Sequence, residues 1–364
     1  MIRFYPDNPS VSYLKHILAF HYEESFPTVP PYLREDLMRA ANSAVTANTH
    51  STYRTALSSW HQCCAETGIV GSFPAKEDDI LTYVGWLLHK QICAATISSY
   101  LSGIRAAHLE KGTNPPVIRT DLVNLVLHGE ANRDNLKKKT GKKKSRIPMT
   151  PTSLKLLKAE LSASDMSYHD KRLIWAVSSI LYFGALRPGE VLCKNSNSFE
   201  PTSSLLLKDL TVKACKINEK DSKLLQVYIS SEKTNTTGKG RLIDIYSCPA
   251  SDLCPVRAYS KFCEASNLKD DGKPAFRLRS GKNFTTNLFN KKLKQYLGKH
   301  LNSETGFVSG HSFRIGITSL VSQLGYDEDQ IKSLGRWSSQ AYLSYIRLPR
   351  TRRQEIARAL QDAA

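Results

Sequence analysis

The feature that most constrains the fold of this 364-residue chain is a lysine-rich run near its middle. Residues 131–148 read ANRDNLKKKTGKKKSRIP, with almost no apolar residue among the basic ones. Like charges at that density repel one another and resist packing, so the run predicts an interdomain linker over 131–149. The chain on either side is long enough to bury its own hydrophobic core. We therefore expect two domains.

The charge balance indicates a polyanionic partner. Lys and Arg number 51 against 33 Asp and Glu, which gives a formal charge of +18. Such a surplus favours nucleic acid, because neutralised phosphates release counterions. Simple solubility and an anionic membrane surface are the alternatives. The residues predicted to contact double-stranded DNA lie in the linker and in a later turn: Lys137, Lys138, Lys139, Lys142, Lys143, Lys144, Arg146 and Lys239.

The same basic run is typical of a nuclear import signal, so we expect a nuclear protein. A solvated linker with no specific role is the alternative interpretation. No stretch of 18 apolar residues is present, and the N-terminus lacks an apolar signal core. The eight cysteines are scattered and match no common zinc spacing, so we expect free thiols and neither metal nor cofactor.

Helical spacing of apolar residues runs through the N-terminal third. It predicts helices over 35–48 and 52–65, the latter with Leu57 and Trp60 on its apolar face. Two more helices are expected to follow, one capped by Asp78 or Asp79 and one by Thr96. Short amphipathic helices in succession predict a small helical bundle.

The part after the linker mixes helices with strands. Three β-rich segments follow one another without a helix between them, which predicts a small antiparallel sheet from 204–213, 224–231 and 241–246. Thr236–Gly240 is expected to form the turn between the last two. The predicted helices of this part span 153–162, 170–183, 252–265, 285–297, 311–324, 328–334 and 339–347.

Residues 310–316 read GHSFRIG and place a histidine and an arginine at the start of a predicted helix. His311 and Arg314 are three residues apart and so share one helical face. Unpaired backbone N–H groups in the first turn already favour anions. The pair could hold a phosphate, with Arg314 bidentate and His311 as a proton carrier.

Two further segments carry polar residues in an apolar context. Residues 183–192 (FGALRPGEVL) place Arg187 and Glu190 just after an apolar helix, and residues 334–347 (LGRWSSQAYLSYIR) hold Tyr342 and Tyr345. Read alone, the arginine would be a surface charge and the tyrosines would belong to a core.

Together, and in this order, the three segments resemble the active site of the tyrosine recombinases, also called phage-type integrases. The resemblance rests on Arg187 with Glu190, the His311–Arg314 pair, the LGRW at 334–337, and Tyr345. The sequences GHSFRIG, LGRWSS and YIR are most similar to those of recombinases of eukaryotic mobile elements, the Crypton and DIRS-like groups. The resemblance covers most of the chain.

The resemblance implies a mainly α fold with a small antiparallel β-sheet. An N-terminal helical core-binding domain would be followed by an α+β catalytic domain. The expected boundaries are 1–34 for an N-terminal extension, 35–130 for the core-binding domain, 131–149 for the linker, 150–350 for the catalytic domain and 351–364 for a tail helix. The resemblance implies that this tail docks on a neighbouring protomer. Packing of the tail helix on its own domain is an equal alternative.

The resemblance also implies a lysine on a β-hairpin, for which Lys233 is preferred to Lys239. One position departs from the family pattern. The residue nine before Tyr345 is Arg336, whereas Trp337 lies eight before it. Either could contact the phosphate, and we favour Trp337 through its indole N–H, with Arg336 in support.

The implied chemistry is DNA cleavage and rejoining through a 3′-phosphotyrosyl link at Tyr345, without metal or ATP. Four protomers would act on two DNA sites, for excision and integration of a mobile element. A type IB topoisomerase is one alternative, and a domesticated DNA-binding protein that has lost catalysis is another. A helix-turn-helix transcription factor fits poorly, since no such turn ties two predicted helices.

Overall fold

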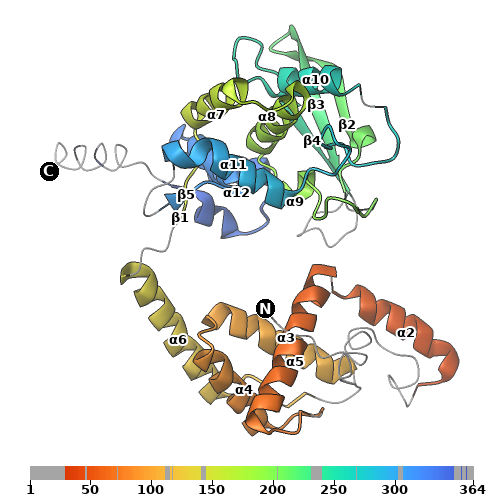
Figure 1. Cartoon of the computed structure of the whole chain (residues 1–364), viewed down its shortest axis with the longest axis vertical. Coiled ribbons are helices and arrows are strands. Elements are labelled where there is room, and N and C mark those ends of the chain that lie inside the picture. Colours follow the sequence, from red (N-terminus) through yellow and green to blue (C-terminus); the bar gives the residue numbers. More distant parts are fainter. Residues whose placement is uncertain are drawn as a thin grey trace. The chain divides into compact units, whose positions relative to one another are not determined.

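The structure, a computed structural model, divides the chain into two compact units, Met1–Gly141 and Lys142–Ala364 (Figure 1). The division falls inside the run predicted to be a linker. The residues that the structure describes are 29–45, 47–71, 73–110, 115–116, 118–140, 145–202, 204–230, 240–267, 269–301, 306–347, 354 and 358. The predicted tail 351–364 therefore lies almost wholly outside them.

The first unit is helical. Its helices are α2 (Pro31–Ser43), α3 (Ala47–Thr67), α4 (Glu77–His89), α5 (Ala94–Glu110) and α6 (Asp121–Thr140). Helix α5 packs against α3 and α6, and α3 also contacts α4. The predicted apolar face of α3 is confirmed, because Leu57 and Trp60 are fully buried in this core.

Helix α6 was not predicted. It continues to Thr140, so the predicted linker begins inside a helix. Apolar and polar contacts both hold this helix against the rest of the unit. Val123 is buried in the core, and the Asp134 carboxylate accepts a hydrogen bond from the Ala94 backbone N–H at 3.1 Å. Lys137, Lys138 and Lys139 extend the last turns of this helix, and their side chains lie outside the described part of the chain.

Three local expectations for this unit were wrong. The helix expected over 35–48 begins and ends earlier, since α2 spans Pro31–Ser43. Helix α4 begins after Lys76, and Asp79 lies in its first turn, where its carboxylate accepts from the Lys76 N–H. Thr96 lies inside α5, which begins at Ala94, and the Ala94 N–H donates to the Asp134 carboxylate.

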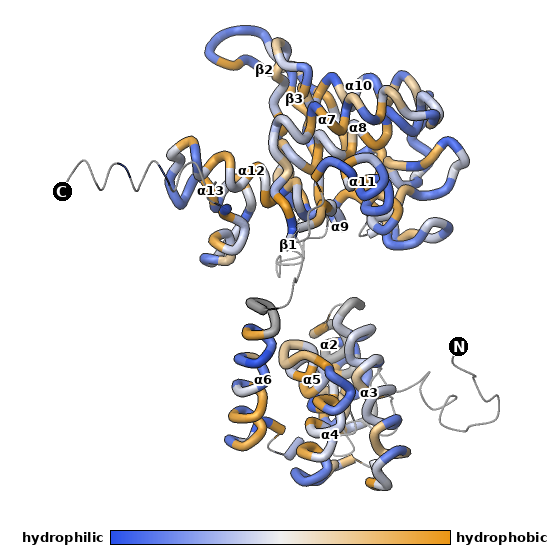
Figure 2. The backbone as a smooth tube through the Cα atoms, turned by 60° about the vertical axis from the view of Figure 1, so that its left-hand side comes forward, coloured by the Kyte–Doolittle hydropathy of each residue, from blue (hydrophilic) through white to orange (hydrophobic). Residues whose placement is uncertain are grey.

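The second unit is built around helix α8 (Tyr168–Phe183). Helices α7 (Pro151–Ala163), α10 (Pro255–Ser266) and α12 (His311–Gln323) all pack against it. Figure 2 shows the hydrophobic colour along α8, whereas α11 (Thr286–Leu301) is mostly hydrophilic. The remaining helices of the described part of this unit are α9 (Pro188–Val191), α13 (Glu328–Gly335) and the 3₁₀ segments η1 (Leu207–Asp209) and η2 (Gln340–Tyr345).

The predicted antiparallel sheet is confirmed. Its strands β2 (Leu210–Ile217), β3 (Lys220–Ile229) and β4 (Arg241–Tyr246) are arranged in the order β2-β3-β4. The inner residues of β3 are buried and α10 covers that face. Residues 204–209, predicted as part of the first strand, form a loop and η1 instead, since Leu206 forms an isolated antiparallel bridge with Pro274 and does not pair with β3.

A second sheet was not predicted. Strand β1 (Ser145–Arg146) pairs in parallel with β5 (Gly306–Phe307). The Met149 N–H continues this connection by donating to the Ser312 carbonyl at 2.8 Å. Arg146, assigned to the linker from the sequence, therefore lies on a strand of the second unit, and the partner strand β5 precedes the start of α12.

No helix among the residues described is long and apolar enough to cross a membrane. Over the same residues, no group of three or more His, Cys, Asp or Glu side chains could hold a metal ion.

Candidate active site

The first turn of α12 carries two of the predicted site residues, His311 and Arg314. Gly310 immediately precedes the helix, and its N–H donates to Asn290 Oδ1 at 2.8 Å. A Cβ at Gly310 would lie only 2.5 Å from the Pro188 ring. Glycine at this position therefore lets the start of α12 approach α9, which follows Arg187.

The end of α8 turns the chain toward the same place. The Leu186 N–H donates to the Leu181 carbonyl and the Ala185 N–H to the Tyr182 carbonyl. These two bonds, with Ala185 at a φ of 46°, form a Schellman helix terminus. Arg187 follows this turn directly and becomes the residue before α9.

Helix α13 ends in the same way. The Trp337 N–H donates to the Lys332 carbonyl and the Arg336 N–H to the Ser333 carbonyl. Arg336 occupies the left-handed position, with a φ of 59°. This turn sends the side chains of Arg336 and Trp337 in different directions, which the spacing in the sequence does not reveal.

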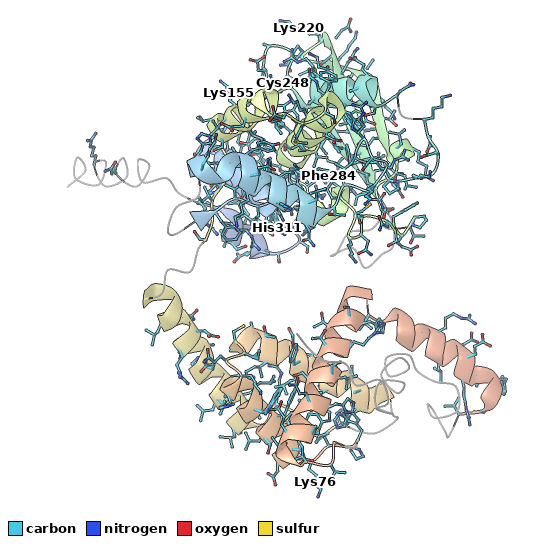
Figure 3. The ribbon with its side chains drawn as sticks, in the orientation of Figure 1. Lys76, Lys155, Lys220, Cys248, Phe284 and His311 are labelled. Atoms are coloured by element: carbon cyan, nitrogen blue, oxygen red, sulfur yellow. The ribbon has the colours of Figure 1, made fainter. Side chains whose placement is uncertain are left out.

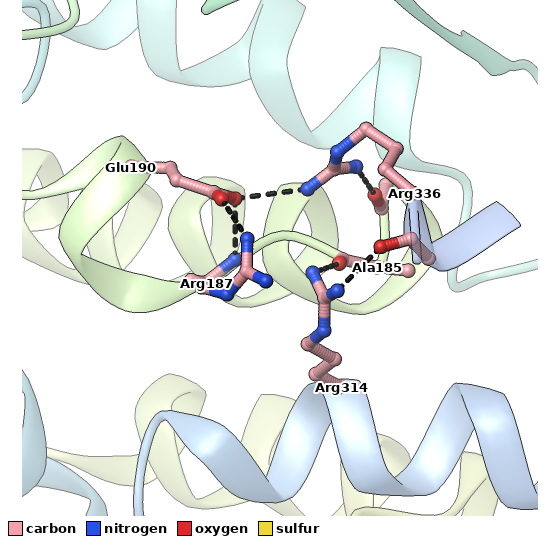
Figure 4. A network of polar contacts seen from close by, with 7 residues as sticks. Ala185, Arg187, Glu190, Arg314 and Arg336 are labelled. Carbon is pink, nitrogen blue, oxygen red and sulfur yellow. Dashed lines mark hydrogen bonds and ion pairs between the residues drawn. The ribbon is translucent and has the colours of Figure 1, made fainter. Parts of the chain in front are cut away.

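Arg314 lies between these two helix ends. Its Nη1 donates to the Ala185 carbonyl at 2.6 Å and its Nη2 to the Gly335 carbonyl (Figure 4). Carbonyls at helix C-termini carry partial negative charge and suit a cation. The side chain is fully buried, and its Nε has no hydrogen-bond partner among the described residues. Burial and the charges of Arg187 and Arg336 lower the pKa of Arg314 to about 10.

A carboxylate joins the other two arginines (Figure 4). Glu190 accepts from the Arg187 backbone N–H and from Arg187 Nη1, each at 2.7 Å. Its other contact is Arg336 Nη2 at 2.9 Å, and Arg336 Nη1 donates to the Gly184 carbonyl at 3.2 Å. Arg336 therefore points toward α8 and α9, with 4% of its side chain exposed, while 17% of the Arg187 side chain is exposed.

His311 is partly buried at the edge of this cluster. Burial lowers its pKa from 6.5, and the nearby positive charges of Arg146 and Arg314 act in the same direction. The imidazole therefore holds a proton less readily than an exposed histidine does. Figure 3 places His311 on the side of the second unit opposite Lys220, which begins β3 after the β2–β3 turn.

Two aromatic rings cover the Arg314 guanidinium. The Trp337 ring centroid lies 4.4 Å from Arg314 Cζ and the Tyr345 centroid 5.6 Å from it. The two rings are 5.2 Å apart. Tyr342, the other tyrosine of this segment, packs with Trp337 and Ile331 instead and is 6% exposed. Of these two tyrosines, Tyr345 is the one whose ring lies against the Arg314 guanidinium.

The structure thus brings together Arg187, Glu190, His311, Arg314, Arg336, Trp337 and Tyr345. Arg146 is exposed on β1, close enough to affect His311. Both hairpin lysines, Lys233 and Lys239, lie outside the described residues, as do Lys142, Lys143 and Lys144. The predicted turn at Thr236–Gly240 also lies there, except for its last residue.

Sequence reasoning missed the backbone carbonyls of Ala185 and Gly335. A carbonyl carries no residue-type signal, so only the two helix termini could have indicated them. It also missed Ser319 on α12, whose hydroxyl contacts the backbone of the tyrosine segment.

The sequence matches no known protein-family model and no curated protein. Solved structures do match the fold. The XerH site-specific recombinase bound to its difH substrate aligns with a TM-score of 0.58 and 13% identity, over 95% of this chain and 92% of that one. The Tn1549 transposon integrase with circular intermediate DNA gives a TM-score of 0.51 at 15% identity, over 90% and 98% of the two chains.

A lambda integrase dimer bound to a core site aligns with a TM-score of 0.52 and 11% identity, over 86% of this chain and 75% of that one. At these identities the likeness establishes the fold, which is that of the tyrosine recombinases.

Proposed function

Because the chain has the fold of the tyrosine recombinases, we propose that it is a site-specific recombinase that cleaves and rejoins DNA through Tyr345. The observation that carries the proposal is the convergence of Arg314, Trp337 and Tyr345 on one point, with Arg187 and His311 beside it. A phosphate-binding cluster with a phenol against it is what phosphoryl transfer to tyrosine requires.

The proposed step is an in-line displacement at phosphorus. The Tyr345 Oη forms a bond to the scissile phosphorus, and the bond from phosphorus to the 5′ oxygen breaks. The tyrosine proton passes to a base, for which neutral His311 is the candidate. The leaving 5′ oxygen takes a proton from Lys233, the acid implied by the family resemblance. Rejoining reverses these transfers. The covalent 3′-phosphotyrosyl link conserves the energy of the broken phosphodiester bond, so the proposed reaction uses neither metal nor ATP.

The arginines would stabilise the charge that develops on the non-bridging oxygens. Arg187 is partly exposed and can reach a phosphate from its place beside Glu190. Arg314 is covered by the Trp337 and Tyr345 rings in the DNA-free protein. We infer that DNA binding moves the Tyr345 ring off the guanidinium, which uncovers Arg314 and frees the phenol for attack together.

Trp337 is the proposed third donor to the phosphate, through its indole N–H. Arg336 is the less suitable candidate because both of its terminal nitrogens already donate, to Glu190 and to the Gly184 carbonyl. In this proposal Arg336 supports the site by holding Glu190, which in turn orients Arg187.

The biological setting is also a proposal. Both units and the basic run would bind double-stranded DNA. The side chains that would contact its phosphates are Lys137 to Lys139, Lys142 to Lys144, Arg146 and Lys239. Four protomers would assemble on two sites for excision and integration of a Crypton-like or DIRS-like mobile element. The basic run would direct the protein to the nucleus.

Covalent trapping tests the proposal. Wild type and Tyr345→Phe are incubated with a pool of nicked duplexes, from which the short cleaved strand diffuses away. Gel shifts establish that both bind, and denaturing gels reveal adducts. We expect an adduct from wild type alone. An adduct from Tyr345→Phe would place the nucleophile elsewhere, with Tyr342 next to test, and binding without any adduct would favour a DNA-binding relic. Relaxation of supercoiled DNA without site preference by a monomer would favour a type IB topoisomerase.

A further inference from the structure

One buried hydroxyl joins the phosphate-binding helix to the chain that carries the tyrosine. Ser319 lies on α12 and is 3% exposed. Its Oγ donates to the Tyr345 carbonyl at 3.1 Å and accepts from the Arg347 N–H at 3.0 Å. A hydroxyl can donate and accept at once, which lets this single short side chain hold the backbone on both sides of Ile346.

Further contacts hold the same segment. One helical turn after Ser319, Gln323 Nε2 donates to the Arg347 carbonyl at 3.3 Å. Arg347 Nη1 donates to the Ser344 and Ile346 carbonyls at 2.7 and 2.9 Å. Gln323 and Arg347 are exposed, so water can replace their bonds, whereas the buried Ser319 has no such substitute.

Helix α12 therefore carries both partners of the reaction. Its first turn holds His311 and Arg314, and the Ser319 hydroxyl, five residues after Arg314, fixes the Tyr345 backbone. Because a helix is stiff, this one element sets the distance between the phosphate-binding residues and the Tyr345 backbone. The Tyr345 ring remains free to leave Arg314 by rotation of its side chain, since Ser319 binds only the backbone.

We propose that Ser319 is a positioning residue that sets the placement of Tyr345 relative to the phosphate-binding arginines, an inference that rests on the proposed function. Ser319→Ala leaves the Tyr345 carbonyl and the Arg347 N–H without the Ser319 hydroxyl as partner. The Tyr345 backbone is then no longer held in one position relative to the phosphate-binding arginines. Small displacements of a reacting group reduce rates steeply.

The first test is single-turnover cleavage of nicked duplex at saturating protein. We expect Ser319→Ala to slow adduct formation by roughly tenfold or more with DNA affinity unchanged, and Ser319→Thr to restore much of the rate because it keeps the hydroxyl. Ser322→Ala, three residues further along α12, is the matched control and should cleave like the wild type. Cleavage by Ser319→Ala at the wild-type rate would overturn the inference and leave the proposed function standing.

A second test separates positioning from general damage to the site. In a Tyr345→Phe background, hydrogen peroxide supplies an external nucleophile whose oxygen attacks the bound phosphate. The bond to the 5′ oxygen breaks, and that oxygen takes up a proton. We expect Ser319→Ala to leave the rate of this peroxide reaction unchanged, since a nucleophile that diffuses in from solution does not depend on how the protein positions Tyr345. An equal loss in both reactions would show that Ser319 is merely structural. Absence of any adduct from the wild type would overturn the proposed function, and this inference with it.

Discussion

Arg336 Nη2 lies 2.9 Å from Glu190 Oε2, and this ion pair ties the end of α13 to the start of α9. Both side chains are almost fully buried. The pair holds Glu190 in position to accept two further hydrogen bonds from Arg187. Arg336 does this from a left-handed backbone conformation that an L-residue adopts at a cost.

That conformation separates the side-chain and backbone contributions of Arg336. Arg336→Ala removes the ion pair, so that Glu190 is paired with Arg187 alone, and it keeps a non-glycine residue in the left-handed conformation. We expect it to reduce the free energy of unfolding by about 3 kcal/mol. Arg336→Gly removes the same ion pair but relieves the backbone, so its loss should be smaller by about 1 kcal/mol. Urea unfolding followed by tryptophan fluorescence measures both. An alanine variant as stable as the glycine variant would contradict the assignment of the strain.

Trp337→Phe tests the indole N–H as a phosphate donor. Phenylalanine keeps a ring over Arg314 and against Tyr345, so the unfolding midpoint should change little. The lost donor should lower the single-turnover cleavage rate by about a hundredfold. Trp337→Ala should lower both the rate and the stability, because it also leaves a cavity. A phenylalanine variant with wild-type cleavage would show that Trp337 acts only by packing and would return Arg336 to consideration.

Gly316 is the point of closest approach between α12 and the segment before α7. A Cβ there would lie 1.7 Å from the Met149 carbonyl oxygen, which is backbone and cannot rotate away. We expect Gly316→Ala to displace the start of α12 and to destabilise the second unit by about 2 kcal/mol or more. Gly85→Ala in α4 has open space around it and should stabilise its helix slightly. Differential scanning calorimetry of both variants checks the contrast, and an unchanged Gly316→Ala transition would refute it.

His108 gives the first unit a defined dependence on pH. Its imidazole is buried, lies against the Ile104 carbonyl through Nδ1 and accepts the Ala75 N–H through Nε2 at 3.0 Å. Burial lowers its pKa from 6.5, so the unfolded chain binds a proton more readily than the folded one. Stability should therefore be full above about pH 6.5 and fall as the pH drops toward the folded pKa.

Hydrogen exchange of the α5 amides between pH 5 and 7.5, corrected for intrinsic rates, measures this dependence. The His108→Gln variant is the control, since it cannot titrate and should lose the acid-dependent component. Protection of α5 that is the same at both ends of the pH range would contradict the prediction.

The sequence predicted most of the second unit because its apolar periodicities are strong. The segment 241–246 coincides with β4, and the predicted 170–183 falls within α8. Helix α6 was missed because its lysines suggested an extended linker, although its charged face needs only solvent and its other face packs through Val123. Strands β1 and β5 are two residues each, too short for a period of two to be recognised.

At the site, the residue types were visible in the sequence but their directions were not. Arg336 and Trp337 are neighbours in the chain, and only the left-handed turn at Arg336 sends one to Glu190 and the other over Arg314. The partners of Arg314 are carbonyls, which no motif records. The role of Lys233 stays a prediction, because residues 231–239, which connect β3 to β4 and include it, lie outside the described residues.

The most direct test of the central claim is to identify the residue that carries the DNA. The trapped adduct is digested with nuclease and trypsin, and mass spectrometry locates the peptide that retains a nucleotide remnant. We predict a single modified peptide, with the phosphate on Tyr345 and linked to a 3′ nucleotide. A remnant on Tyr342, or on any residue other than Tyr345, would contradict the assignment of the nucleophile.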